Sequence, residues 1–203
     1  MYKIAVLISG GGSNLQAILD NIEKGNLNCS IEAVIADSPK ATGIKRAASR
    51  SIDTYILNKK ELGDSLSDEI LKILDKKVDL IVLAGFLSIL NGKLLKRFKD
   101  RIINIHPSLI PSFCGNGMYG IKVHEAALDY GVKVSGCTVH LVDEGTDTGP
   151  ILFQNTVPVY SEDSAKDLQA RILVEEHLAL SKAINKFSLG KILVIDRKVI
   201  IEE

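Results

Sequence analysis

Short apolar runs alternate with stretches of helical periodicity through the first half of the chain. Runs typical of buried strands cover residues 4–8, 31–35 and 80–83, and stretches with helical spacing cover residues 15–22, 41–48 and 66–74. Strands that are apolar on both faces are typical of parallel sheets covered by helices. The alternation therefore predicts an α/β fold, with a mostly parallel, twisted sheet and helices on both faces.

The second half of the chain adds further strands and one long helix. Residues 133–142 and 150–159 are β-rich, residues 164–187 have helical spacing with Asp163 or Ser164 as the N-cap, and residues 192–201 resemble a small hairpin. No low-complexity linker and no internal repeat divides the sequence. We therefore expect a single domain over residues 1–203.

Charge and cysteine content restrict the partners and the compartment. The 25 basic and 25 acidic side chains cancel, which leaves no overall field to attract nucleic acid or an anionic membrane. Small-molecule partners are therefore expected. Cys29, Cys114 and Cys137 form no plausible disulfide framework, and the apolar segment near the N-terminus is too short to span a membrane. We expect a cytoplasmic protein.

Three consecutive glycines, Gly10 to Gly12, separate the first apolar run from the first helical stretch. A strand, a glycine turn and a helix N-terminus together form an anion site, because unpaired backbone N–H groups and the helix dipole converge there. The spacing matches neither a dinucleotide fingerprint nor a Walker loop, so neither NAD nor ATP is favoured. A turn that only closes the strand onto the helix is the alternative, but Ser13 and Asn14 favour a sugar phosphate.

The least regular segment covers residues 104–120 and contains two prolines and three glycines. Loops of this length are often functional, so we expect a mobile flap over the site. The segment opens with Asn104 and His106, which project to the same side of an extended chain. An amide can stabilise a developing oxyanion and an imidazole can carry a proton near neutral pH, and acyl transfer to an amine needs both.

An acidic loop at residues 143–150 offers a carboxylate to hold the imidazole of His106. The candidates are Asp143, Glu144 and Asp147, and the sequence alone does not choose among them. Taken singly, His106 could be a structural histidine, and the acidic loop could be a solvated turn or a metal site. Taken together with Asn104, they favour a catalytic arrangement.

The remaining histidines do not form a recognisable metal-binding pattern. His124, His140 and His177 are scattered and do not pair with the cysteines, so we expect no metal site. His140 is interpreted as a structural residue near the site and His124 as ordinary helix surface. Cys114 is interpreted as a plain loop cysteine, because no dedicated base accompanies it.

Three motifs carry a resemblance to a known family. Residues 103–111 read Ile-Asn-Ile-His-Pro-Ser-Leu-Ile-Pro, residues 83–86 read Leu-Ala-Gly-Phe, and residues 143–150 read Asp-Glu-Gly-Thr-Asp-Thr-Gly-Pro. Together with the glycine loop, and in this order along almost the whole chain, they resemble the phosphoribosylglycinamide formyltransferases. Such a protein would have a Rossmann-like formyltransferase fold. Its N-terminal half would bind the ribonucleotide phosphate, and its C-terminal half would bind folate and hold the catalytic residues.

The resemblance also implies substrates and roles. The substrates would be glycinamide ribonucleotide and 10-formyltetrahydrofolate, without a metal, and the protein would be a monomer or homodimer. Asn104 would stabilise the oxyanion, His106 would handle the proton, and Asp147 would orient and charge the imidazole. The ribonucleotide-binding residues would be Gly12, Ser13, Asn14 and Glu176. The folate-binding residues would be Lys60, Leu87, Ser88, Ile89, Leu90, Asn104, Asp143, Glu144, Gly145, Thr146 and Asp147.

Three positions depart from the family pattern. Ser88 stands where an arginine is common, Leu173 replaces a polar residue, and Lys60 is the match to an arginine near the folate tail. Two related folate enzymes, methionyl-tRNA formyltransferase and formyltetrahydrofolate hydrolase, resemble the same Asn-x-His and Asp arrangement. Both carry an additional domain for which 203 residues leave no room, so we expect neither. A non-catalytic sugar-phosphate or folate sensor is the alternative of another class.

Overall fold

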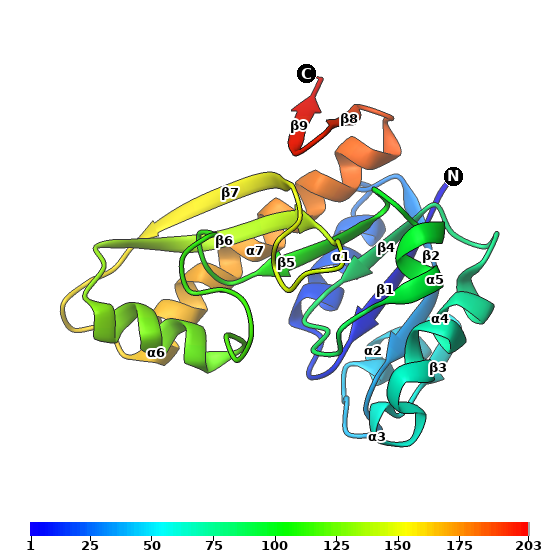
Figure 1. Cartoon of the computed structure of the whole chain (residues 1–203), viewed down its shortest axis with the longest axis horizontal. Helices are drawn as coiled ribbons and strands as arrows, with labels where there is room; N and C mark the ends of the chain where they lie inside the picture. The colour runs from blue at the N-terminus through cyan, green and yellow to red at the C-terminus, as the bar shows by residue number, and fades with distance from the viewer. Residues whose placement is uncertain (203) are drawn as a thin grey trace.

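The computed structural model describes residues 1–202, which build one seven-stranded sheet and a separate two-stranded hairpin (Figure 1). The sheet order is β3-β2-β1-β4-β5-β6-β7. Its strands are β1 (Tyr2–Ile8), β2 (Cys29–Ala36), β3 (Thr54–Ile56), β4 (Leu80–Leu83), β5 (Ile102–His106), β6 (Val134–Leu141) and β7 (Ile151–Pro158). All neighbours from β3 to β5 are parallel, whereas β6 is antiparallel to both β5 and β7. The predicted α/β class with a mostly parallel sheet is confirmed.

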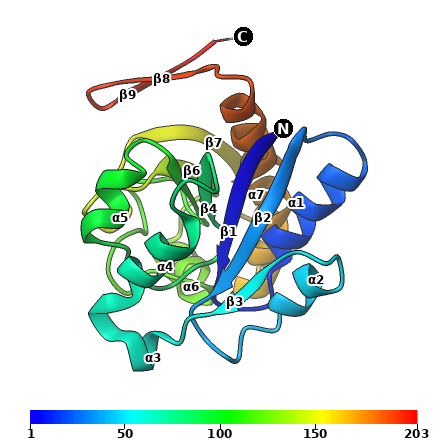
Figure 2. The same cartoon turned by 90° about the vertical axis from the view of Figure 1, so that its right-hand side faces the viewer.

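Helices cover both faces of the sheet (Figure 2). They are α1 (Ser13–Glu23), α2 (Ile44–Ala48), α3 (Lys59–Leu62), α4 (Leu66–Leu74), α5 (Gly92–Arg97), α6 (Ile121–Tyr130) and α7 (Ala165–Ser188), with a 3-10 turn at Gly63–Ser65. Alternate residues of β1 enter two separate cores. Ile4, Val6 and Ile8 join the core under α1 and α7, and Ala5 and Leu7 join the core under α4 and α5. A strand buried on both faces reads as a continuous apolar run, which explains the sequence pattern.

The end of the chain follows the prediction closely. Ser164 is the N-cap of α7, and its hydroxyl and the Asp167 carboxylate form a capping box. Asp163, the other candidate, instead forms an ion pair with Arg171. The hairpin consists of β8 (Ile192–Ile195) and β9 (Lys198–Ile201), joined through Asp196 in the left-handed region.

Several element boundaries differ from the predictions. The helix expected over residues 41–48 begins only at Ile44, because the preceding residues form turns. Strand β5 runs to His106, so the segment expected to be irregular from residue 104 onward begins at Pro107. Neither β3 nor α5 was expected. Both are short, and too few residues repeat for periodicity to identify them.

The strand order places the loops that form the site. The chain moves from β1 outward to β2 and β3, and then returns to the other side of β1 as β4. Such a reversal opens a crevice at the carboxyl ends of the two central strands. The glycine loop leaves β1 there, and Gly85 leaves β4 beside it, with a hydrogen bond from Ser9 N to Gly85 O.

Candidate active site

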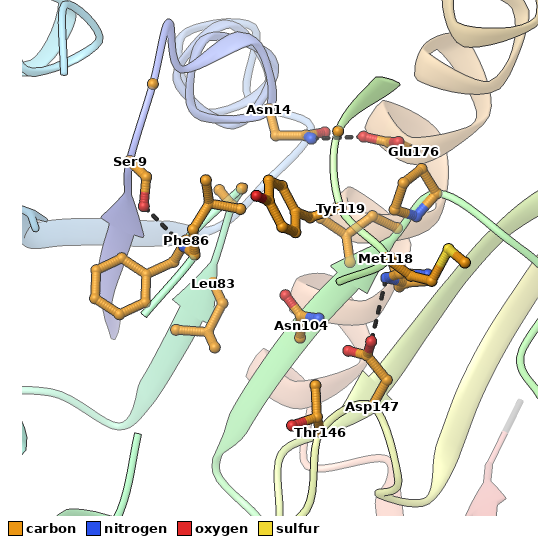
Figure 3. A pocket seen from close by; sticks show the side chains of 18 of the residues that line it. Ser9, Asn14, Leu83, Phe86, Asn104, Met118, Tyr119, Thr146, Asp147 and Glu176 are labelled. Carbon is orange, nitrogen blue, oxygen red and sulfur yellow. Dashed lines mark hydrogen bonds and ion pairs between the residues drawn. The ribbon is translucent and has the colours of Figure 1, made fainter. Parts of the chain in front are cut away.

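A cavity of about 750 Å³ lies at the carboxyl ends of β1, β4 and β5 (Figure 3). Its walls are the glycine loop, the segment after β4, the end of β5, the residues before α6, the acidic loop and one face of α7. Segments that are far apart in the chain therefore share one opening. A concave site of this size, with polar groups converging on it, is suited to small-molecule ligands.

The glycine loop leaves the N-terminus of α1 open toward this cavity. Gly12 is the N-cap and has a φ of 69°, a left-handed conformation that glycine adopts without steric cost. No side chain among residues 1–202 caps this helix end. The first N–H groups of an α-helix have no partners within the helix, so those of α1 are available to an anion.

Asn14 and Glu176 lie on either side of this end of the cavity and contact each other. Asn14 Nδ2 donates to Glu176 Oε2 over 2.7 Å, and both side chains are buried (Figure 3). Within residues 1–202, Asn14 Oδ1 has no hydrogen-bond partner. Burial raises the pKa of Glu176, and the hydrogen bond from Asn14 only partly opposes this effect.

The segment after β4 presents an apolar surface to the cavity. The side chains of Leu87 and Ile89 are 59% and 56% exposed, although both are large and apolar. Its backbone is nevertheless fixed. Leu87 N donates to Ser9 Oγ over 2.7 Å, and Asn91 N donates to Ser67 Oγ over 3.0 Å. Ser88, the departure from the family pattern, donates its hydroxyl to Asp37 Oδ2 over 2.7 Å.

Asn104, His106 and Asp147 come together on one side of the cavity. Asn104 and His106 are alternate residues of β5, and both line the cavity, as the extended spacing predicts. His106 Nδ1 lies 3.5 Å from Asp147 Oδ2. Gly115 N also donates to Asp147 Oδ2, over 2.9 Å, so the segment before α6 is tied to the same carboxylate.

The acidic loop separates the roles of its aspartates. Asp143 Oδ1 accepts hydrogen bonds from Gly145 N and Thr148 Oγ1 and so holds the loop together. Asp147 has a φ of 58°, a strained conformation for a residue with a side chain, and turns its carboxylate toward the imidazole. Asp147 is thus the acid of this loop whose carboxylate contacts the imidazole of His106, and its catalytic role stays a prediction.

His140 orients the amide of Asn104. The two residues are directly opposite each other on β6 and β5, and Asn104 Nδ2 lies 3.1 Å from His140 Nε2. His140 Nδ1 lies 2.8 Å from the Leu141 carbonyl, to which it donates. With Nδ1 as the donor to Leu141, Nε2 is the ring nitrogen that can accept from the Asn104 amide. The second N–H of the Asn104 amide is left for other partners. The interpretation of His140 as a residue near the site is confirmed.

A similar argument identifies the titrating atom of His106. Its Nε2 lies 2.9 Å from the Phe113 carbonyl and carries a hydrogen to donate there. Nδ1, which faces Asp147, is therefore the atom that gains or loses a proton. Burial lowers the pKa of His106, while the Phe113 carbonyl and the Asp147 charge act in the opposite direction.

Asp147 is the charged partner in this arrangement. Burial alone would raise the pKa of Asp147. The contact with the His140 imidazole, the hydrogen bond from Gly115 N and the nearby His106 imidazole outweigh burial and leave that pKa below its usual value. Asn104 competes for the same nitrogen of His140 and lies closer to it than Asp147 Oδ1 does, at 3.1 Å against 3.6 Å. We therefore assign the main stabilisation of the carboxylate to Gly115 and His106.

His124 is not helix surface, and that expectation was wrong. It is only 2% exposed, lines the cavity and has no hydrogen-bond partner for Nδ1 among the described residues. Helix α6 packs against α7, which buries the face that also carries Val123 and Ala127. Burial, and to a smaller extent the nearby His106, lowers the pKa of His124 to about 4.

Other predicted site residues fall inside or outside the cavity. Lys60 is exposed on α3 and Glu144 is exposed in the acidic loop, and neither lines the cavity. Their contact with folate stays a prediction. The lining residues include Gly12, Ser13, Leu87, Ser88, Ile89, Leu90, Asp143, Gly145 and Thr146.

One face of α7 contributes lining residues that the sequence analysis missed. Lys166, Gln169 and Leu173 line the cavity together with Glu176. They recur at intervals of three or four residues, which is the spacing of one helical face. That spacing, anchored on Glu176, is a signal that could have found them.

Comparison with known proteins agrees with this geometry. Residues 2–184 match the model of the formyl transferase family. The chain belongs to the formyl transferase family. The phosphoribosylglycinamide formyltransferase of Haemophilus influenzae is 37% identical over 202 residues, which cover 97% of this chain and 92% of that protein. The predicted resemblance to this group is confirmed.

Relatives of other lengths and solved structures extend the comparison. The chloroplastic phosphoribosylglycinamide formyltransferase of Arabidopsis thaliana is 41% identical over 86% of this chain, and the chain spans only 61% of that relative. Glycinamide ribonucleotide transformylase 1 of Symbiobacterium toebii superimposes with a TM-score of 0.90 at 40% identity, covering 100% of this chain and 95% of that one. A formyltetrahydrofolate deformylase of Pseudomonas syringae has a TM-score of 0.88 at 26% identity, covering 100% of this chain and 66% of that one.

Proposed function

We propose that this chain transfers the formyl group of 10-formyltetrahydrofolate to the amine of glycinamide ribonucleotide, in purine biosynthesis. One observation carries the proposal. Asn104, His106 and Asp147 converge on a cavity that lies between an open helix N-terminus and an exposed apolar segment. One end suits a phosphate and the other suits a flat aromatic ring, and the polar residues lie in the same cavity.

The acceptor would bind at the glycine loop. Its phosphate would accept hydrogen bonds from the N–H groups of Gly12, Ser13 and Asn14, and the helix dipole would favour the negative charge. Glu176 lines the same end of the cavity and would accept from hydroxyl groups of the ribose. The amine would then extend toward β5.

The donor would bind along the segment after β4. The exposed side chains of Leu87 and Ile89 offer an apolar surface to the pteridine, and backbone groups from Leu87 to Leu90 would contact its polar edge. The acidic loop lines the same cavity through Asp143, Gly145, Thr146 and Asp147. The formyl group would then lie near Asn104 and His106.

In the proposed reaction the amine attacks the formyl carbon, and the formyl oxygen becomes the oxyanion of a tetrahedral intermediate. The N–H of Asn104 that His140 does not use would stabilise this charge. Collapse re-forms the carbonyl and breaks the bond to the folate nitrogen. The attacking nitrogen loses a proton and the departing nitrogen gains one, and His106 beside Asp147 would carry it. The transfer is direct and needs no acyl-enzyme.

A hydrolase is the second candidate, because the deformylase of Pseudomonas syringae shares the fold. Water would then replace the amine as the nucleophile. The test supplies formyl folate with glycinamide ribonucleotide, with initiator methionyl-tRNA, or with water alone. We expect rapid turnover with the ribonucleotide only. Comparable turnover in water alone would favour the hydrolase, turnover with the tRNA would favour a tRNA modifier, and binding without turnover would favour a sensor.

We also propose a cytoplasmic location, two small-molecule partners and a monomeric or homodimeric state. Cys29, Cys114 and Cys137 are free thiols, which is typical of a reducing compartment and supports the cytoplasm. Among residues 1–202, no helix is both long and apolar enough to cross a membrane. The partners would be the two small substrates, and the protein would act as a monomer or homodimer.

A further inference from the structure

The connection between β2 and α2 touches both loops that are assigned to substrates. This connection, here called the bridging segment, covers residues 37–46, from the end of β2 into α2. None of its residues lines the cavity. Its first residue, Asp37, contacts Ser88 in the segment after β4, and its last residue, Arg46, contacts Gly11 in the glycine loop.

At one end, Asp37 holds Ser88. The Asp37 side chain is only 6% exposed, and its Oδ2 accepts from the Ser88 hydroxyl over 2.7 Å. Asp37 N in turn lies 3.3 Å from Ile8 O, to which it donates, so the backbone of Asp37 is anchored to the central strand β1. A buried carboxylate is costly without a donor, and Ser88 is the donor that the structure provides. Ser88 is therefore fixed from behind, on the side away from the cavity.

At the other end, Gly43 packs closely against the glycine loop. Gly43 N donates to Gly10 O over 3.0 Å. A Cβ atom at Gly43 would lie 2.9 Å from Ile8 Cδ1 and 3.0 Å from both Gly10 O and Gly12 Cα. Two of these three contacts are backbone atoms, which cannot rotate away. A side chain at position 43 would therefore push against the backbone of the glycine loop.

Arg46 clamps the same loop from α2. Its Nε donates to Gly11 O over 2.9 Å, and its Nη1 donates to Gln16 Oε1 over 2.8 Å. One guanidinium thus joins the glycine loop to the first turn of α1. Hydrogen bonds from a charged donor are stronger than neutral ones, and the fixed fork of arginine sets their direction.

We propose that the bridging segment positions both substrate loops, with its two ends acting on different substrates. Asp37, through Ser88, fixes the donor-binding segment, whereas Gly43 and Arg46 fix the acceptor-binding glycine loop. These are positioning residues, since they lie behind the cavity wall. The assignment of each loop to a substrate rests on the proposed function, whereas the separation into two ends rests on the contacts alone.

Steady-state kinetics of two single variants test the separation. Arg46→Ala should raise the KM for glycinamide ribonucleotide about tenfold and leave the KM for formyl folate unchanged within about twofold, and Asp37→Ala should do the reverse. Lys45→Ala and Asp53→Ala serve as controls, because Lys45 is the exposed chain neighbour of Arg46 and Asp53 is an exposed aspartate that does not line the cavity. Neither control should change either KM. Equal increases in both KM values for each variant, or no increase in either, would overturn the proposal.

Two further variants separate positioning from loss of folding. Asp37→Asn keeps an oxygen that can accept from Ser88, so its KM for formyl folate should equal that of the wild type. A general loss of packing at position 37 would not give this result. Adding Ser88→Ala to Asp37→Ala should cost no more than Ser88→Ala alone, because the two residues act through one contact. Additive effects would show that Asp37 does not act through Ser88.

Hydrogen exchange of the ligand-free variants gives a readout that does not depend on activity. Asp37→Ala should speed exchange in residues 86–91, and Arg46→Ala should speed it in residues 10–16, each without affecting the other segment. If the wild-type chain transfers no formyl group but exchange changes in this local pattern, the proposed function fails and the positioning role stands. Exchange that rises throughout the chain in both variants would overturn the role.

Discussion

Removing the charge of Asp147 while keeping its shape is the sharpest test of the catalytic arrangement. In Asp147→Asn the amide oxygen can still accept a hydrogen bond from Gly115 N, so we expect the loop to keep its conformation. What disappears is the negative charge that faces His106 Nδ1 at 3.5 Å. The variant therefore separates the electrostatic contribution of Asp147 from its structural one.

The size of the effect follows from this distance. Two unit charges 3.5 Å apart attract by about 5 kcal/mol at an effective dielectric constant of about 20. The cost of removing both groups from water offsets part of this attraction. A remainder of about 3–4 kcal/mol corresponds to a decrease in kcat of about 10²- to 10³-fold.

The pH profile gives a second, independent observable. Burial already lowers the pKa of His106, and the Asp147 charge opposes this effect. Loss of that charge should lower the pKa of His106 further, so the limb of the profile that reports protonation of His106 should move to lower pH.

The assay is formyl transfer measured from pH 5 to 9 on wild type, Asp147→Asn and the control Asp143→Asn. Among residues 1–202, Asp143 accepts hydrogen bonds from Gly145 and Thr148 of its own loop, so its variant should keep near wild-type kcat. Both ligands should still bind to Asp147→Asn. A wild-type kcat and pH profile in Asp147→Asn, together with loss of activity in Asp143→Asn, would contradict the role assigned to Asp147.

Three further predictions concern other parts of the cavity. His106→Ala should lower kcat by about 10²- to 10⁴-fold, the usual range for acid–base catalysis, and isothermal titration should show ribonucleotide binding nearly intact; weakened binding with normal kcat would contradict the assigned role. Burial lowers the pKa of His124 to about 4. Between pH 6.5 and pH 4, His124 is therefore protonated in the unfolded chain but not in the folded chain. Stability measured by urea unfolding should therefore fall by up to about 3 kcal/mol as the pH drops from 6.5 to 4, and His124→Gln should reduce this slope; an unchanged slope would refute the assignment. Crystals soaked in phosphate should show the anion at the N–H groups of Gly12, Ser13 and Asn14, and a loop blocked by its own side chains would contradict the acceptor site.

The sequence predicted the parts of the fold that local patterns determine. Residues 80–83 and 66–74 were placed correctly because a strand buried on both faces is continuously apolar, and a helix on a sheet repeats its apolar residues. The cap at Ser164 was also readable, because it depends on neighbours in the chain. Short edge elements such as β3 depend on pairing with β2, which no local pattern records.

The candidate site was predicted only in part, for a similar reason. Asn104 and His106 lie two residues apart in one strand, so their shared direction could be worked out from spacing. The burial of His124 depends on how α6 packs against α7. Asp37 contacts Ser88 and Arg46 contacts Gly11, and in both pairs the residues are distant in the chain. Such contacts belong to the tertiary structure, and one sequence does not reveal them.

The central claim is tested most directly by following the formyl carbon itself. The wild-type chain is supplied with 10-formyltetrahydrofolate labelled in the formyl group, with and without glycinamide ribonucleotide, and the label is measured in formylated ribonucleotide and in formate. We expect nearly all of the label in the ribonucleotide when it is present, and negligible formate when it is absent. Release of formate at the same rate in both reactions, without labelled ribonucleotide, would contradict the proposed function.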